Sequence, residues 1–148
     1  MSMASYDWEP TKGEWRELSS RYLGKAIDKE ATFTLPGSGQ QIHRPCFETL
    51  YDLILRRFFE DQPVVLTGNP GLGKSVALFS VLLQLLSEKP TEDVIFIYYE
   101  TGFFFRGEEV YRAAASAIEG LPPPVETLGS PPIVLVRGHE CYARYADS

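Results

Sequence analysis

The residues with the clearest chemical potential run from Gly68 to Ser75 and read GNPGLGKS. They fit the pattern G-x-x-x-x-G-K-[ST], in which glycines let the backbone turn so that successive amide groups point at one anion. In such a loop the lysine reaches the β- and γ-phosphates of a nucleotide, and the hydroxyl binds Mg²⁺. We therefore expect a nucleoside triphosphate, ATP in the first place or GTP, to bind here, with Ser75 as the magnesium ligand. The predicted binding residues are Gly68, Asn69, Pro70, Gly71, Leu72, Gly73, Lys74 and Ser75.

The segments on either side of this loop suit that role. Val64 to Thr67 form a short apolar stretch, as expected of a strand that delivers the chain to the loop. Ser75 to Lys89 are apolar on nearly every side, which predicts a helix buried against more than one neighbour. Val94 to Tyr99 read as a strand covered on both faces, as in a parallel sheet. The order strand, loop, helix, strand predicts a βαβ unit whose helix dipole also favours an anion.

The residues before this unit predict a helical extension. Residues 1–10 show no periodic pattern, and we expect a flexible, loosely attached terminus there. Apolar residues recur at helical spacing within 11–27 and again from Pro45 to Phe59, where the proline suits a first turn. Ala31 to Leu35 form a brief alternating piece between the two helices. The expected organisation is a terminus 1–10, a helical extension 11–62 and an α/β core 63–148.

The residues after Tyr99 predict one more helix and one more strand. Residues 107–120, GEEVYRAAASAIEG, combine two acids in a first turn with alanine-rich helix formers and a terminal glycine. Residues 131–138, PPIVLVRG, read as a third strand after a proline-rich connector. Phe103 to Phe105 read as apolar contact residues, or alternatively as an exposed interaction patch. The predicted fold class is α/β, with three layers like those of a P-loop NTPase and a short, mostly parallel sheet.

A family resemblance rests on the loop and the helix before it. TGNPGLGKSVALFSVLLQLL, Thr67 to Leu86, resembles the phosphate-loop segment of the Crinkler and retrotransposon-hot-spot NTPases, a signal shared with STAND and AAA-type ATPases. HRPCFETLYDLILRRFFED, His43 to Asp61, is similar to the segment that precedes the first strand in those proteins. The resemblance implies nucleotide binding with slow Mg²⁺-dependent hydrolysis. In the family a later strand carries an acid that helps hold the metal, whereas PPIVLVR runs into Gly-His-Glu.

Hydrolysis by a P-loop enzyme needs an acid near the metal and a group that orients water. Glu100 is the best-placed candidate, because it follows a strand and ligands of open α/β sheets lie beyond the carboxyl ends of strands. The alternative is that Glu100 is a solvated residue opening a loop. Glu140 and Asp147 are further candidates. Two arginines, Arg106 and Arg137, could neutralise phosphate charge or simply face solvent.

The composition of the chain restricts the kinds of partner that it is expected to bind. The chain has 148 residues with a net charge of -6, so it has no overall positive field to attract nucleic acid. Its longest apolar segment, Val76 to Leu86, is about half of a bilayer span, and no secretion signal precedes it. We expect an intracellular protein, cytoplasmic or nuclear, without a membrane partner.

The stretch from Pro63 to Ser148 is short for a complete P-loop core, so we expect an incomplete one. An incomplete sheet exposes an edge or an apolar face, which favours a homo-oligomer or a protein partner. Two alternatives to an NTPase stay open. One is a non-catalytic remnant that acts as a protein-interaction module, and the other is a small-molecule kinase.

Overall fold

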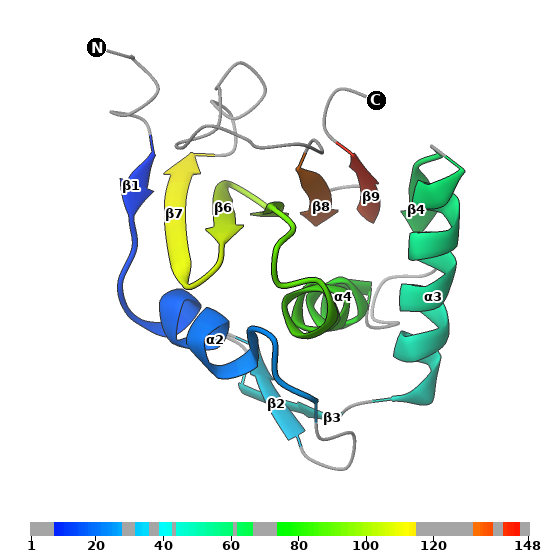
Figure 1. The fold of residues 1–148 in the computed structure, drawn as a ribbon, viewed down its shortest axis with the longest axis horizontal. Helices are drawn as coiled ribbons and strands as arrows, with labels where there is room; N and C mark the ends of the chain where they lie inside the picture. Colours follow the sequence, from blue (N-terminus) through cyan, green and yellow to red (C-terminus); the bar gives the residue numbers. More distant parts are fainter. Residues whose placement is uncertain are drawn as a thin grey trace.

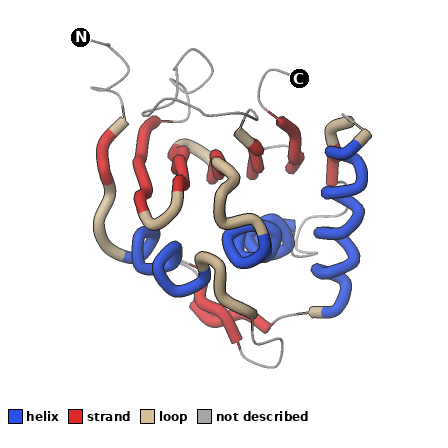
Figure 2. The backbone as a smooth tube through the Cα atoms, viewed as in Figure 1, coloured by secondary structure: helices blue, strands red, loops and turns tan. Residues whose placement is uncertain are grey.

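The computed structural model of the chain describes residues 8–27, 32–35, 39–42, 44–60, 62–66, 74–114, 132–137 and 141–145. These residues form a mixed α/β fold in which the helices gather on one side of a large sheet (Figures 1 and 2). The helices are α2 (Glu14–Tyr22), α3 (Pro45–Phe59) and α4 (Lys74–Glu88). The strands are β1 (Glu9–Pro10), β2 (Thr32–Leu35), β3 (Gly39–Ile42), β4 (Val64–Leu66), β5 (Val94–Tyr98), β6 (Thr101–Arg106), β7 (Glu109–Ala114), β8 (Ile133–Arg137) and β9 (Cys141–Tyr145).

Seven of these strands form one sheet in the order β1-β7-β6-β5-β8-β9-β4, while β2 and β3 pair with each other. Within the seven-stranded sheet only β5 and β8 pair in parallel, and every other neighbouring pair is antiparallel. The described sheet is therefore mostly antiparallel, where the sequence predicted a mostly parallel one. The reason is that two-residue turns join β5 to β6 and β6 to β7, and such turns place consecutive strands side by side in opposite directions.

The helix predicted over residues 107–120 is wrong for its described part, because Glu109–Ala114 form β7 instead. This strand lies between β6 and β1. Val110 packs into the core on the helix side of the sheet, while Ala113 is buried on the opposite face. Pairing on both edges and burial on both faces outweigh the helix propensity of the alanines, which is only a weak preference. Residues 115–120 lie outside the described part of the chain.

Residues 8–10, the end of the terminus that the sequence predicted to be loosely attached, are instead held against the sheet. Trp8 is only 3% exposed and packs edge-to-face on Phe104, with ring centroids 5.9 Å apart. Glu9 and Pro10 pair with β7 at one edge of the sheet. Glu9 and Pro10 are therefore part of the sheet and Trp8 packs against it, whereas residues 1–7 are outside the described ranges.

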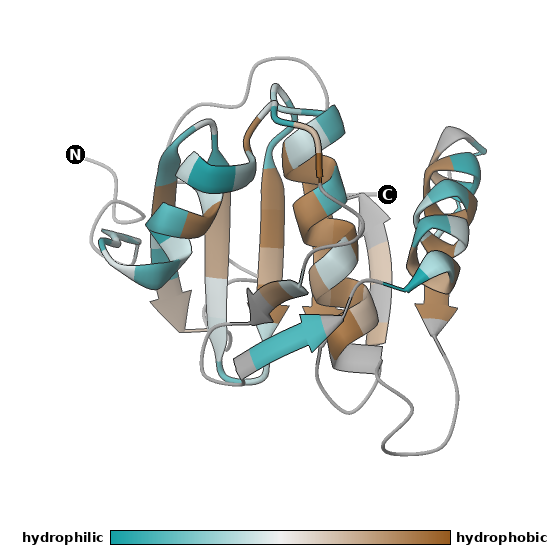
Figure 3. Ribbon diagram, turned by 90° about the horizontal axis from the view of Figure 1, so that it is seen from below, coloured by the Kyte–Doolittle hydropathy of each residue, from teal (hydrophilic) through white to brown (hydrophobic). Residues whose placement is uncertain are grey.

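The three helices confirm the periodicity found in the sequence. Helix α4 lies in the middle of the helical layer, and Figure 3 shows hydrophobic residues along its length. Its central side chains are inaccessible to solvent, as predicted for a helix with several neighbours: Leu78, Phe79, Val81, Leu82 and Leu85 are each 0% exposed. The neighbours are α2, α3, β8 and β9. The β2–β3 hairpin also contacts α4, through Phe33 stacked on Phe79 at 5.8 Å.

Candidate functional site

The predicted loop leaves the sheet at an edge where several strands end. Strand β4 is antiparallel to β9, which is antiparallel to β8, and β8 is parallel to β5. Strands β4, β5 and β8 therefore run in the same direction, and their carboxyl ends lie at the same end of the sheet. We call this end of the strands the loop edge, as distinct from the edge strands β1 and β4. The register aligns Leu66 with Cys141, Cys141 with Arg137, and Arg137 with Tyr98 in a single row along that edge.

Helix α4 begins at the end of this loop. The structure describes β4 up to Leu66 and α4 from Lys74, so residues 67–73 span the distance from the sheet edge to the start of a helix. The loop itself, Gly68 to Gly73, lies outside the described residues. Of Lys74 and Ser75 the structure gives the helical backbone, in the first turn of α4. The strand and helix predicted to flank the loop are thus both present.

Buried polar contacts fix the position of α4. The side-chain amide of Gln84 donates to the Phe47 carbonyl oxygen of α3 at 3.4 Å and to the Ser80 hydroxyl at 3.2 Å. Gln84 is 6% exposed and Ser80 1%, so these bonds form where water cannot replace them. Helix α4 therefore meets α3 in a defined register through its later turns.

Glu100 lies at the correct edge but several strands away from the loop. It is exposed and occupies the two-residue turn between β5 and β6, because Tyr98 pairs with Thr101. Strands β9 and β8 separate β4 from β5. Neighbouring strands lie about 4.8 Å apart, so Glu100 starts about 14 Å from the end of β4. Helix α4 packs over β8 and β9, the two strands between β4 and β5.

Arg106 is not at this edge. Strand β6 leads away from it, and Arg106 at the far end of the strand binds the Asp93 carboxylate through Nε at 2.8 Å and through a terminal nitrogen at 2.5 Å. That hydrogen bonding raises the pKa of Arg106 above its ordinary value. The arginine therefore serves an internal ion pair rather than a phosphate. Arg137 belongs to the row at the loop edge, whereas Glu140 and Asp147 lie outside the described residues.

Two aromatic residues at this edge were not singled out from the sequence. Tyr98 ends β5 and stacks on Phe96, with ring centroids 6.2 Å apart. Tyr99 follows in the turn, remains 50% exposed and meets Tyr98 edge-to-face at 5.0 Å. The sequence signal was the pair of tyrosines directly before Glu100, but their position in a tight turn depends on the pairing of β5 with β6. The predicted apolar run Phe103 to Phe105 is buried inside β6, which excludes the exposed patch.

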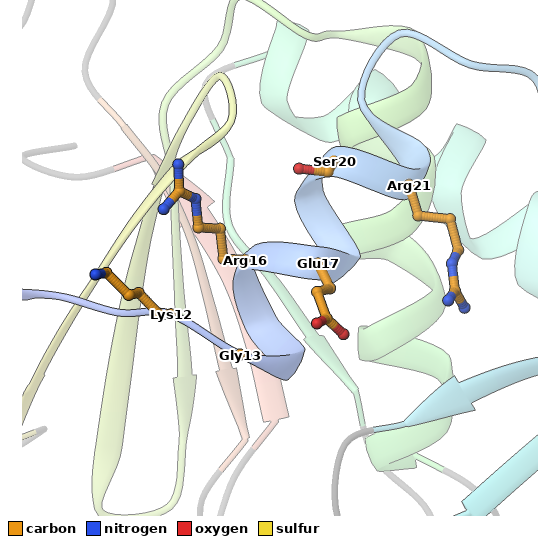
Figure 4. A pocket seen from close by; sticks show the side chains of 6 residues that line it. All are labelled: Lys12, Gly13, Arg16, Glu17, Ser20 and Arg21. Atoms are coloured by element: carbon orange, nitrogen blue, oxygen red, sulfur yellow. The ribbon is translucent and has the colours of Figure 1, made fainter.

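A second surface feature is a shallow hollow of about 560 Å³ on the outer face of α2 (Figure 4). Its lining residues are Lys12, Gly13, Arg16, Glu17, Ser20 and Arg21. Ser19, which directly precedes Ser20 on the helix, donates a hydrogen bond of 2.7 Å to the carbonyl oxygen of Gly107, which lies in the β6–β7 turn. That turn lies at the opposite ends of the strands from the loop edge. The hollow is therefore remote from the predicted phosphate site, and it has the charged surface expected of a solvated helix face.

The described residues contain no group of three or more histidine, cysteine or acidic side chains arranged to hold a metal ion. Among the described helices, none has the length and apolar character needed to cross a bilayer. Comparison with known protein families gives no match, and no curated protein or solved structure is significantly similar to the chain.

Proposed function

We propose that the chain binds a nucleoside triphosphate, ATP before GTP, through residues 68–75, with Mg²⁺ bound by Ser75. One observation carries the proposal: β4 ends at Leu66 and α4 begins at Lys74, so the G-x-x-x-x-G-K-S motif joins a strand end to the start of a buried helix. A glycine-rich loop in this context offers backbone amides to phosphate oxygens. The fold proposed with it is a P-loop NTPase-like domain, consistent with the Crinkler-type resemblance of the motif.

The support beneath the loop suits an anion site. Helix α4 has fifteen residues, and the partial positive charge of its first turn lies at the end of the loop. The helix contacts α3, β8 and β9, and Gln84 in its later turns donates a hydrogen bond to α3. We therefore expect the amides of the first turn of α4 to need little binding energy to be ordered.

The proposal also includes slow hydrolysis of the bound nucleotide, with Glu100 as the catalytic acid. The carboxylate is at the same edge as the loop, but about three strand spacings, roughly 14 Å, separate it from β4. Glu100 would therefore act on water at the outer side of the nucleotide rather than on Ser75 directly. We place such an activity inside the cell, in cytoplasm or nucleus, where ATP and Mg²⁺ are available.

A second candidate function is a non-catalytic interaction module that still binds nucleotide. It is favoured by β4, which is the last strand of the described sheet and carries Val65 with 56% exposure. A sheet edge with an exposed apolar side chain can pair with a second copy or another chain. This candidate predicts nucleotide binding without phosphate release, together with a dimer or hetero-complex in light scattering.

The decisive experiment is thermal unfolding with ATP, GTP or neither, with and without Mg²⁺. At a free ligand concentration of 100 times the dissociation constant, binding adds about 2.7 kcal/mol to the free energy of unfolding. For a domain of this size we expect the midpoint to rise by about 5–10 °C. Lys74→Ala should abolish the rise, whereas Lys89→Ala, just beyond the other end of α4, should retain it. An unchanged wild-type midpoint under all conditions would refute nucleotide binding.

Phosphate release then separates the two candidates. The enzyme predicts slow, Mg²⁺-dependent release that Glu100→Gln reduces while the nucleotide-dependent rise in midpoint remains. Release that is equal in wild type and Glu100→Gln would remove Glu100 from the mechanism. Absence of release in a wild-type protein that is stabilised by ATP would favour the interaction module.

A further inference from the structure

Two turns of the same length have different residues at their first position. The β5–β6 turn consists of Tyr99 and Glu100, and the β6–β7 turn of Gly107 and Glu108. Both first positions have positive backbone angles, with φ of 56° at Tyr99 and 57° at Gly107. Two-residue hairpins favour this conformation because its twist matches that of the strands, and glycine, asparagine and aspartate adopt it most readily.

Tyr99 is the exception to that preference. Within the described residues it is the one non-glycine residue with a positive φ. A bulky L-residue in this region is strained, and such strain is found where neighbouring structure or function requires the side chain. The turn at Gly107, at the opposite edge of the sheet, has the residue that the geometry favours. Tyr99 therefore occupies a position that its backbone conformation disfavours.

The side chain of Tyr99 is placed by its contact with Tyr98. Its ring meets the ring of Tyr98, which packs against the core on the α4 face, and half of its surface remains exposed. Tyr98 is aligned with the last residue of β8, one of the two strands beneath α4. Strand β5, which Tyr99 follows, is one strand spacing from β8 and two from β9, roughly 5–10 Å. A nucleoside attached to phosphates at the start of α4 is long enough to span such a distance.

We propose that Tyr99 is a positioning residue for the base of the nucleotide, against which its exposed ring stacks. The inference rests on the proposed function of the same site and adds the recognition of an aromatic base. Stacking on a tyrosine accepts any nucleobase, because every base has a π-face. The other large apolar residues exposed in the described part of the chain, Leu53 and Val65, are aliphatic and offer no such surface.

The test compares two ligands that share phosphates but differ in the base. MgATP and magnesium tripolyphosphate are titrated calorimetrically into wild type, Tyr99→Asn and Tyr99→Trp. Tyr99→Asn should weaken ATP binding about five- to 150-fold and leave tripolyphosphate binding unchanged. Tyr99→Trp should retain ATP binding, because it keeps a stacking surface. Asparagine suits a positive φ, so the Asn variant should unfold at a temperature equal to or above that of wild type.

Tyr111→Asn is the matched control, because Tyr111 is a partly exposed tyrosine of the same sheet that packs on the face opposite α4. It should bind both ligands as wild type does. Equal ATP affinity in wild type and Tyr99→Asn would overturn the base contact while leaving phosphate binding intact. Equal weakening of ATP and tripolyphosphate would overturn it as well, since Tyr99 would then act through the loop. A wild-type protein that binds neither ligand would refute the proposed function together with this inference.

Discussion

Replacing Trp15 with alanine should remove a large part of the stability of the domain. Trp15 lies on α2 and stacks on Phe103 of β6, with ring centroids 4.1 Å apart and planes 21° from parallel. It also contacts three more rings, those of Phe79, Phe96 and Phe105. The side chain therefore joins the N-terminal helix both to the sheet and to α4, the helix that supports the predicted loop.

The expected loss follows from these contacts. Truncation of a buried tryptophan costs about 3–5 kcal/mol, and because Trp15 is only partly buried we expect a value near 3 kcal/mol. For a domain of about 150 residues this lowers the unfolding midpoint by roughly 6–12 °C. Urea and thermal unfolding, followed by circular dichroism, measure the loss. The adjacent exposed residue provides the control, since Arg16→Ala should change stability by about 0.5 kcal/mol or less.

Two results would refute this reasoning. A loss below about 1 kcal/mol would mean that the aromatic cluster does not bear on stability as its geometry indicates. Two separate unfolding transitions, of which Trp15→Ala shifts only one, would mean that the N-terminal helix is not part of the same cooperative unit as the sheet.

Two further predictions concern buried polar groups. Ser19 is 0% exposed and its hydroxyl donates to the Gly107 carbonyl oxygen. Ser19→Ala should therefore lower the free energy of unfolding, measured in urea, by about 1–2 kcal/mol. Ser20 has a more exposed side chain, so Ser20→Ala should cost less than half as much. The pKa of Tyr51 is raised above its ordinary value of 10.0. Burial is the largest cause, and the carboxylates of Glu88 and Asp52 raise the pKa further. Because the folded-state pKa is the higher one, this contribution to stability is complete below about pH 10 and is lost as the pH rises above it. Tyr51→Phe should therefore lessen the alkaline fall in unfolding free energy, and an unchanged slope would contradict the assignment.

The helices were predicted well because their signals are local. The apolar residues of α2, α3 and α4 recur at the period of the helix, and each backbone hydrogen bond of a helix joins residues four positions apart. The loop motif is also a local signal, and the bounds of its flanking strand and helix, as described, differ from the predicted ones by one residue. Its phosphate-binding role stays a prediction.

The strand arrangement was predicted poorly, because partners of strands are distant in sequence. Residues 109–114 have a composition that suits a helix, and only the pairing with β6 and β1 makes them a strand. Glu9 and Pro10 belong to a terminus without a pattern of its own, yet they form an edge strand of the sheet because they pair with β7. Neither outcome can be obtained from periodicity within the segment itself.

The sequence by itself determined the three helices, the position of the loop motif between a strand and a helix, and the apolar character of β5 and β8. Only the tertiary structure decided that the sheet is mostly antiparallel, that β9 and β8 lie between the loop strand and Glu100, and that Arg106 pairs with Asp93 away from the loop. It also decided that Tyr99 adopts a positive φ at the loop edge. The physical reason is that helix hydrogen bonds and loop motifs are encoded by near neighbours, whereas the order of strands depends on contacts between residues far apart in the chain.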